Sequence, residues 1–220
     1  MPIASDWPTW EAQFAGFIEH TGPAADPAHD IDHIRRVVAN ARALAAHEHA
    51  DLAVVLPAAW LHDCVSVPKS SPLRSQASQL AGQAAQEFLQ SIGYPAQYLP
   101  AIQHAIEAHS FSANITPQTC EAMVVQDADR LDSLGAIGLA RCLMLSGAMG
   151  RRLYDPLEPI PATRSLDDQA NAIDHFYAKL FQLAERMTTQ AGRSEAIKRT
   201  NFLQAFVDQL REEIPTLGDQ

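Results

Sequence analysis

Histidine and aspartate side chains stand at three separated places along the chain, in a pattern that suits the binding of one metal ion. His33 comes first, the adjacent pair His62 and Asp63 follows, and the run QDADRLD at 126–132 supplies further carboxylates. Imidazole nitrogens and carboxylate oxygens together suit Mn, Fe, Co, Ni or Mg better than a cysteine-type zinc site. These residues therefore predict a mixed nitrogen and oxygen cation site, provided that the fold brings them together.

The first two positions are expected to face the core. His33 lies on an apolar helical stripe that also contains Val37, Ala41 and Leu44. Asp63 lies on the same helical face as Leu56 and Ala59, at the end of an apolar segment. A buried aspartate is costly unless it is paired or binds a metal. By contrast, the second His-Asp pair, at 29–30, precedes a helix and is interpreted as a capping segment.

The carboxylates of the run at 126–132 present a choice. Asp127 and Asp129 are two residues apart, about 200° around a helix, so they cannot both point one way. Asp127 shares a stripe with Leu131 and Leu134, which favours Asp127 as the inward residue. Asp132 is interpreted as part of a solvated face. The pattern alone leaves the ligand open between Asp127 and Asp129.

The elements that must position these residues are helices. Helical periodicity covers nearly the whole chain, and no convincing period-2 strand is evident. We predict an all-α fold, a single domain over 1–220 of about seven or eight helices, with a metal-site core at about 25–150 and C-terminal helices in 165–213 packed on it. The predicted helices span about 9–19, 32–47, 51–62, 75–89, 100–109, 116–146, 166–187 and 194–213, with a kink or start at Pro57 and a bend near Gly135 and Gly138.

Composition restricts the partners and the compartment. The 220 residues carry a net charge of −10, which argues against gripping a nucleic-acid polymer, although a bound cation still allows a nucleotide substrate. The three cysteines form no CxxC pair, which favours a reducing cytosol. The N-terminus shows no signal pattern, and the apolar window LGAIGLARCLMLSGAM is too short and too interrupted to predict a membrane span.

The order of these residues resembles the HD superfamily of metal-dependent phosphohydrolases, whose signature is H…HD…D on an all-α fold. The similarity to small stand-alone bacterial HD proteins extends through HDIDHIRRV, WLHDCVSVPK, HAIEAHSFSA, VQDADRLDSLGAIGLAR and DHFYAKL. Residues 128–131 match the A-D-x-L form of the family, which favours Asp129 over Asp127. The resemblance thus implies four metal ligands, namely His33, His62, Asp63 and Asp129.

Further residues are candidates for catalysis. His104 and His109 lie five residues apart, about 140° around a helix, so joint ligation of one ion is awkward unless the helix ends at His109. We predict that one of them is a general acid or a phosphate contact. The segment after the HD pair, at 64–67, lacks the glutamate that some HD nucleotidases carry. The catalytic base then falls to another residue, with Asp127 and His104 as candidates; alternatively, Asp127 orients a ligating imidazole.

Phosphate contacts are expected in the loop after the HD pair, where Lys69 and Arg74 place two cations in an otherwise acidic chain. The C-terminal helix carries an apolar face that is compatible with packing on the core or on a second subunit, so a monomer and a homodimer both fit. That face consists of Phe202, Ala205, Phe206 and Leu210.

The predicted function is a divalent-metal-dependent phosphohydrolase that uses one ion, Mn²⁺ or Mg²⁺ first and Fe, Co or Ni next. Its substrate is expected to be a small phosphate ester or anhydride, such as a nucleotide that is cleaved to a monophosphate and pyrophosphate. Two alternatives stay open: a di-iron oxidative HD enzyme, with His104 and His109 as extra ligands, and a non-catalytic module that senses nucleotides.

Overall fold

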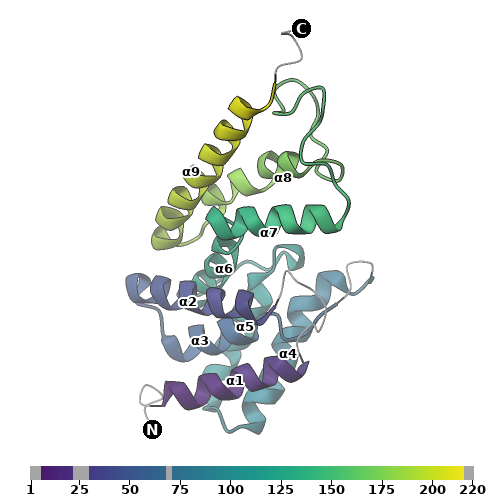
Figure 1. Ribbon diagram of the computed structural model, residues 1–220. Coiled ribbons are helices and arrows are strands. Elements are labelled where there is room, and N and C mark those ends of the chain that lie inside the picture. The colour runs from purple at the N-terminus through teal and green to yellow at the C-terminus, as the bar shows by residue number, and fades with distance from the viewer. Residues whose placement is uncertain (1–5, 22–29, 68–70, 216–220) are drawn as a thin grey trace. The chain divides into compact units, whose positions relative to one another are not determined.

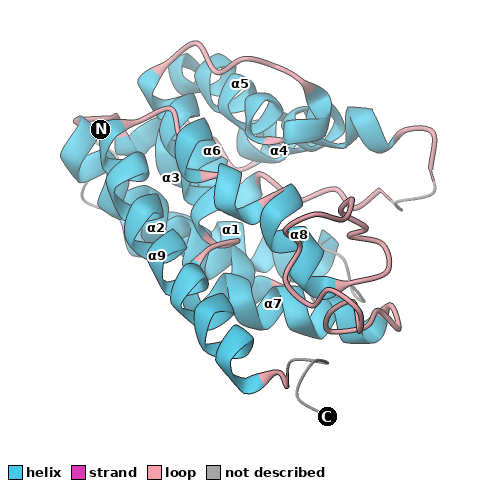
Figure 2. Ribbon diagram, turned by 90° about the horizontal axis from the view of Figure 1, so that it is seen from above, coloured by secondary structure: helices cyan, strands magenta, loops and turns pink. Residues whose placement is uncertain are grey.

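The protein is built from α-helices. The structure, a computed structural model, describes residues 6–21, 30–67 and 71–215, and within them it contains nine α-helices and no β-strand (Figures 1 and 2). The predicted all-α class is confirmed. The helices are α1 (Trp7–Thr21), α2 (Ile31–Glu48), α3 (Leu52–Leu61), α4 (Ala77–Ser91), α5 (Leu99–His109), α6 (Cys120–Leu131), α7 (Gly135–Ala148), α8 (Ala172–Ala178) and α9 (Gln190–Glu213).

Two compact units divide the chain. Unit 1 is formed by the chain up to Asp129 and by Thr188–Ala191, and unit 2 is formed by Arg130–Met187 and the chain from Gly192 onward. The single domain over 1–220, with the helices of 165–213 packed on a core at about 25–150, stays a prediction.

Helix α3 lies at the centre of unit 1, because all of its residues from Ala53 to Leu61 are buried and α1, α2, α4 and α5 contact it. Pro57 lies inside α3 and lacks the N–H that would bond the carbonyl of Ala53, four residues earlier. The Tyr94 hydroxyl donates to that carbonyl at 2.7 Å instead. The helix ends at Leu61, so His62 and Asp63 emerge directly from the core.

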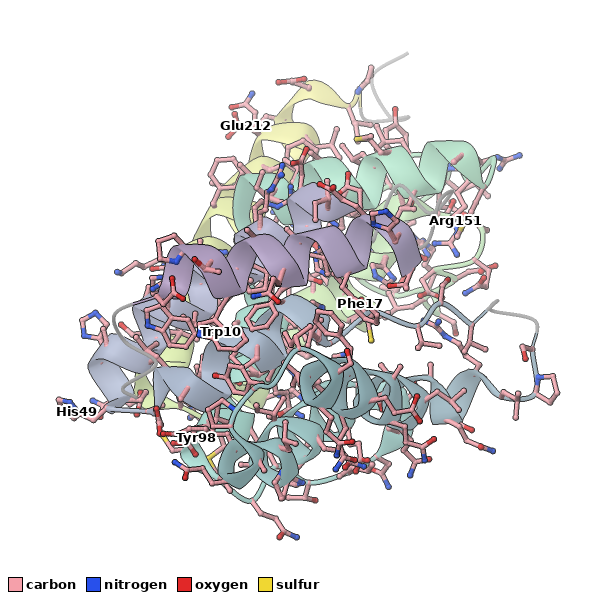
Figure 3. The ribbon with its side chains drawn as sticks, turned by 90° about the horizontal axis from the view of Figure 1, so that it is seen from below. Trp10, Phe17, His49, Tyr98, Arg151 and Glu212 are labelled. Carbon is pink, nitrogen blue, oxygen red and sulfur yellow. The ribbon has the colours of Figure 1, made fainter. Side chains whose placement is uncertain are left out.

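Aromatic side chains attach α1 to the rest of unit 1. Phe17 stacks on Phe88 of α4 with ring centroids 4.0 Å apart, and Trp10 meets the edge of Tyr94 at 5.0 Å. Trp10 and Phe17 are labelled in Figure 3. Such pairs contribute about 0.5–1.5 kcal/mol each beyond their buried area. This aromatic cluster therefore helps to hold α1 and α4 beside the central helix.

The single bent helix predicted over 116–146 is wrong, because two helices, α6 and α7, occupy this range. Gly135 opens α7 with φ of +68°, a left-handed conformation that favours glycine. A Cβ atom at Gly138 would lie 2.2 Å from the carbonyl of Ser133, so the turn also needs glycine there. The two glycines thus break the helix instead of bending it.

The helix predicted over 166–187 is also wrong over most of its length, because α8 covers only Ala172–Ala178 and short 3₁₀ turns follow. The cause is the buried carboxylate of Asp174. It accepts hydrogen bonds from the Arg164 guanidinium and from the backbone N–H of Asp167, which fix the preceding residues as a loop.

Helix α9 extends the helix predicted over 194–213 toward the N-terminus. Within unit 2, Phe206 stacks on Phe176 of α8 with centroids 6.1 Å apart, whereas Phe202 is 48% exposed. Association through this face stays a prediction. Among the described residues, no single helix has the length and apolar character to cross a membrane; α6 and α7 meet that criterion only when they are counted together.

Candidate metal centre

Five imidazole and carboxylate side chains converge in unit 1, and the helices that carry them are labelled in Figure 1. They are His33 in the first turn of α2, His62 and Asp63 directly after α3, His109 as the last residue of α5, and Asp129 near the end of α6. We call them the His/Asp cluster. Its histidines are buried, whereas the side chains of Asp63 and Asp129 are 26% and 30% exposed. The cluster is therefore open to solvent on its carboxylate side.

The distances within the cluster suit shared binding of a cation. Asp129 Oδ1 lies 3.5 Å from His33 Nε2 and 3.9 Å from His62 Nε2. Asp63 Oδ2 lies 3.5 Å from His62 Nε2 and 4.0 Å from His33 Nε2. Ligand atoms about 2.1 Å from one divalent ion are themselves roughly 3–4 Å apart. The separations of His33, His62 and Asp129, and those of Asp63 from His62 and His33, therefore lie in the range expected around a divalent ion.

His109 borders the same group from α5. Its Nε2 lies 3.5 Å from Asp63 Oδ1. Two sets of ligand atoms, each within 4.8 Å, overlap at His62: one contains His33 and Asp129, and the other contains Asp63 and His109. Helix α5 ends at His109, which is the condition set for joint ligation with His104, but His104 Nε2 accepts from the N–H of Gln118 and only His109 borders the cluster.

Backbone carbonyls fix how two of the imidazoles present themselves. His62 Nδ1 lies 2.8 Å from the Ala59 carbonyl, and His109 Nδ1 lies 2.6 Å from the Ile106 carbonyl. Since a carbonyl only accepts, each Nδ1 carries the proton and Nε2 of the neutral ring presents a lone pair. The buried Nε2 of His62 makes no hydrogen bond to any residue that the structure describes. Such an atom suits a metal ligand oriented through its other nitrogen.

Burial and charge set the protonation of the cluster. Burial lowers the pKa of His62 to about 4, so its ring is neutral at pH 7 and able to ligate. Burial also acts against ionised Asp129, but the neighbouring imidazoles His62 and His33 outweigh it and lower the pKa of that carboxyl. For His109, burial is outweighed by the hydrogen bond and charge of Asp63, which raise its pKa. The cluster thus combines a neutral nitrogen donor with an ionised carboxylate.

Two other residues of α6, Gln126 and Ala128, help to hold Asp129 in place. The Gln126 amide donates to the Ala108 carbonyl at 2.7 Å, beside His109. The carbonyl of Ala128 accepts from the Asn40 amide at 3.2 Å, seven residues beyond His33 on α2. Both bonds join α6 to helices that carry cluster histidines. The sequence reasoning missed these two amides, although the position of Asn40, two turns after His33, was a usable signal.

Asp127 faces a different part of unit 1. Its fully buried carboxylate accepts from the backbone N–H groups of Thr188 and Thr189 at 2.8–3.0 Å and from both threonine hydroxyls. These threonines directly precede α9. The inward position expected for Asp127 is thus observed, but the contacts found for its carboxylate are with the start of α9, and Asp129 is the residue that faces the histidines.

The solvated position expected for Asp132 is wrong, because Asp132 is buried and pairs with Arg141 at 2.6 Å. The remaining predicted residues have these surroundings. The N–H of Gln118 donates to His104 Nε2 at 3.0 Å, which places that ring nitrogen against the loop before α6. Arg74 donates to the carbonyl of Val67 at 3.0 Å, across the loop that follows the HD pair. Lys69 and His29 lie outside the described residues. Asp30 caps α2 by accepting from the N–H of His33 at 2.7 Å, so its capping role is confirmed.

The family of the chain follows from this site and from comparisons with known proteins. A model of the HD domain matches residues 30–134, which include His33, the HD pair and Asp129. The chain belongs to the HD-domain family.

Its relatives include the uncharacterized protein YpgQ of Bacillus subtilis (strain 168), which is 35% identical over 191 residues, or 85% of each chain. The crystal structure of that protein in complex with ADP is similar at a TM-score of 0.72 and 32% identity, covering 93% of this chain and 97% of that one. An HD-superfamily hydrolase from Bacillus thuringiensis is similar at a TM-score of 0.73 and 31% identity, covering 94% and 97%.

Proposed function

We propose that the protein is a cytosolic, divalent-metal-dependent phosphohydrolase that acts on nucleotides. The observation that supports this most is the His/Asp cluster, in which the buried Nε2 of His62 lies beside two carboxylates and makes no hydrogen bond within the described residues. Membership of the HD-domain family, with relatives described as HD-superfamily hydrolases, supports the hydrolase class.

The ligands in this proposal are His33, His62, Asp63 and Asp129. Neutral imidazoles and carboxylates favour Mn²⁺ or Mg²⁺, with Fe, Co and Ni as further candidates. A bound divalent ion supplies positive charge that neutralises phosphate oxygens and acidifies water. The exposed sides of Asp63 and Asp129 leave room for a substrate to approach from solvent.

His109 is proposed as the proton donor. Its raised pKa favours a proton on Nε2, beside Asp63 and at the border of the proposed metal ligands. From that atom it can donate a hydrogen bond to a phosphate oxygen or a proton to the leaving oxygen. His104 and Asp127 are not given this role, because His104 Nε2 accepts from Gln118 and the carboxylate of Asp127 holds Thr188 and Thr189.

A nucleotide is the proposed substrate because the related YpgQ was crystallised in complex with ADP. Arg74 and Lys69 are proposed to contact its phosphates. Arg74 donates one N–H to the carbonyl of Val67. Because a guanidinium has five N–H donors, others can bind phosphate oxygens. Cleavage to a monophosphate and pyrophosphate is the reaction we favour.

The test is the release of phosphate and pyrophosphate from a panel of nucleoside mono-, di- and triphosphates, with Mn²⁺, Mg²⁺ or no metal. We expect metal-dependent turnover by the wild type and none by a His62→Ala, Asp63→Ala double variant. Equal rates of hydrolysis for the wild type and the double variant would refute the proposed hydrolase activity. Nucleotide binding in calorimetry without product would favour the sensing module, and two irons per chain after anaerobic purification would favour the oxidative alternative.

A further inference from the structure

The segment between α7 and α8, residues 149–171, is a long ordered loop (drawn as loop in Figure 2). An isolated bridge between Arg152 and Asn171 joins its two ends. The backbone bonds there are Arg152 N–H to the Ala170 carbonyl and Ala172 N–H to the Arg152 carbonyl, both at 2.9 Å. Loops beyond about 12–15 residues without secondary structure are uncommon in compact domains, and those that are ordered usually serve a function.

Side chains hold this loop in one conformation. Arg164 makes two hydrogen bonds of 2.5 Å to the fully buried carboxylate of Asp174 and a third, at 2.9 Å, to the carbonyl of Glu158. The carboxylate of Glu158 in turn accepts from the backbone N–H groups of Ala162 and Thr163 at 2.6 Å. A loop fixed in this way is preorganised, so little conformational entropy would be lost when a ligand binds to it.

A cavity of about 370 Å³ that is open to solvent lies along the loop, within unit 2. Ligand sites commonly measure about 300–1,000 Å³, so the cavity is large enough for a small molecule. Three arginines line it, Arg151, Arg152 and Arg164, in a chain whose net charge is −10. Their convergence therefore needs an explanation other than a generally basic composition.

The acidic groups of the lining are already engaged by the loop. Asp155 Oδ1 accepts from the N–H groups of Leu157 and Glu158 at 2.8 and 3.1 Å, and Asp167 Oδ1 accepts from those of Gln169 and Ala170 at 3.1 and 3.0 Å. These bonds direct both carboxylates toward the polypeptide backbone. Their negative charge is thereby partly compensated at the walls of the cavity.

Two guanidinium groups keep donors available. Arg151, labelled in Figure 3, makes one hydrogen bond of 3.2 Å to the side chain of Gln169. The exposed guanidinium of Arg152 has no hydrogen-bond or ion-pair partner among the described residues. Adjacent guanidinium groups suit the oxygens of phosphate, which they bind through paired N–H donors.

We propose that this cavity is a second binding site, for a small phosphate-bearing anion, with a lining that shares no residue with the His/Asp cluster. Arg151 and Arg152 bind the phosphate oxygens, and the Arg164–Asp174 pair holds the wall behind them. The site does not depend on the proposed hydrolase activity, since none of its lining residues belongs to the His/Asp cluster.

The test is calorimetric titration of the metal-stripped full-length protein at about 0.15 M salt, an ionic strength that screens weak surface attraction. The probes are inorganic pyrophosphate and, separately, adenosine monophosphate, which distinguish a free anion from a nucleotide phosphate. We expect saturable binding of at least one probe by the wild type and by the His62→Ala, Asp63→Ala variant. An Arg151→Gln, Arg152→Gln variant should bind at least tenfold more weakly, with an unchanged melting temperature.

The matched control is Lys198→Gln, Arg211→Gln, which removes the same two charges from exposed positions of α9. It should bind as the wild type does. The proposal is overturned if the wild type binds neither probe at millimolar concentration or if the control weakens binding as much as the arginine variant. Loss of binding in the His62→Ala, Asp63→Ala variant would also overturn it, because the anion would then belong to the His/Asp cluster.

Discussion

Carboxylates in unit 1 and unit 2 have different partners. In unit 2, the Arg164 guanidinium donates two hydrogen bonds of 2.5 Å to the Asp174 carboxylate. In unit 1, the carboxylates of Asp63 and Asp129 face imidazole nitrogens across 3.5–4.0 Å. The first arrangement is complete as it stands, whereas the second leaves room for an ion between its members. Similar side chains thus stabilise a loop in one unit and form a candidate binding site in the other.

The same contrast recurs within a single turn of α6. Asp127 is satisfied by the backbone and hydroxyl groups of two threonines, and Asp129 faces the histidines. Groups that serve function are often less well satisfied than groups that serve stability. Substituting carboxylates on the two sides of this contrast should therefore separate activity from stability.

The largest effect is expected from Asp129→Asn. We expect it to lower metal-dependent hydrolysis and Mn²⁺ affinity at least about 100-fold. Substituting a residue that only hydrogen-bonds to a metal ligand already lowers metal affinity or activity about 10–100-fold. The free energy of unfolding without metal should change by less than about 1 kcal/mol, because Asp129 is partly exposed and not hydrogen-bonded like Asp174. Activity assays and urea titrations measure the two. Loss of stability with retained activity would reverse the comparison.

Asp174→Ala should show the opposite behaviour. It leaves the Arg164 guanidinium, only 17% exposed, without its partner, and breaking a buried pair costs about 3–5 kcal/mol. Metal affinity at the His/Asp cluster should be retained in the folded fraction. The control is Asp208→Ala, at an exposed pair with Arg211, for which a cost below about 1 kcal/mol is expected. Equal costs for the two variants in urea titrations would contradict the assignment.

Asp127→Asn should produce an intermediate result. It weakens the acceptor for the N–H groups of Thr188 and Thr189, at a cost of roughly 1–3 kcal/mol. Because the change lies within one turn of Asp129, we also expect roughly a tenfold loss of Mn²⁺ affinity. Substrate turnover at saturating metal should recover. If saturating metal failed to restore turnover, Asp127 would be a catalytic residue after all.

The smallest effect concerns acid. Burial lowers the pKa of His62 from 6.5 to about 4, so unfolded chains bind its proton more tightly and metal-free protein loses stability as pH falls from 6.5 toward 4. His109 has a raised pKa, so its contribution increases as pH falls through this range and offsets part of the loss from His62. Between pH 7 and 5 we expect a loss of roughly 1–2 kcal/mol from His62. Urea titrations of wild type and His62→Gln check it, and an equal loss in both would exclude His62 as the cause.

The loop of unit 2 should respond at lower pH. Hydrogen bonds from the backbone of Thr163 and Ala162 lower the pKa of Glu158 from 4.5 to about 2. The stability it contributes is therefore present above pH 4.5 and lost as pH falls toward 2. Exchange of the Ala162 and Thr163 amide protons should stay slow at pH 5. Fast exchange at that pH would place the acid-sensitive region in unit 2.

Helical periodicity predicted the all-α class, and apolar stripes predicted the inward positions of His33 and Asp63, because a stripe constrains where a side chain points. The choice of Asp129 came from the resemblance to the HD superfamily, whose A-D-x-L form matches residues 128–131. The sequence patterns failed where a single distant contact decides local structure. The helix expected over 166–187 gives way to a loop because Asp174 binds Arg164, ten residues away, and helical periodicity carries no information about that pair. The apolar stripe also predicted correctly that Asp127 is buried. Burial alone, however, does not determine which groups a carboxylate contacts.

The brief return of the chain to unit 1 limits how the protein can be shortened. Thr188–Ala191 belongs to unit 1, while the residues on both sides of this tetrapeptide belong to unit 2. A fragment that stops at Asp129 keeps every member of the His/Asp cluster. It loses the groups of Thr188 and Thr189 that donate hydrogen bonds to the Asp127 carboxylate. Anyone who wishes to isolate the metal-binding half must therefore graft these four residues back, for example through a designed linker, because no single cut releases that half intact.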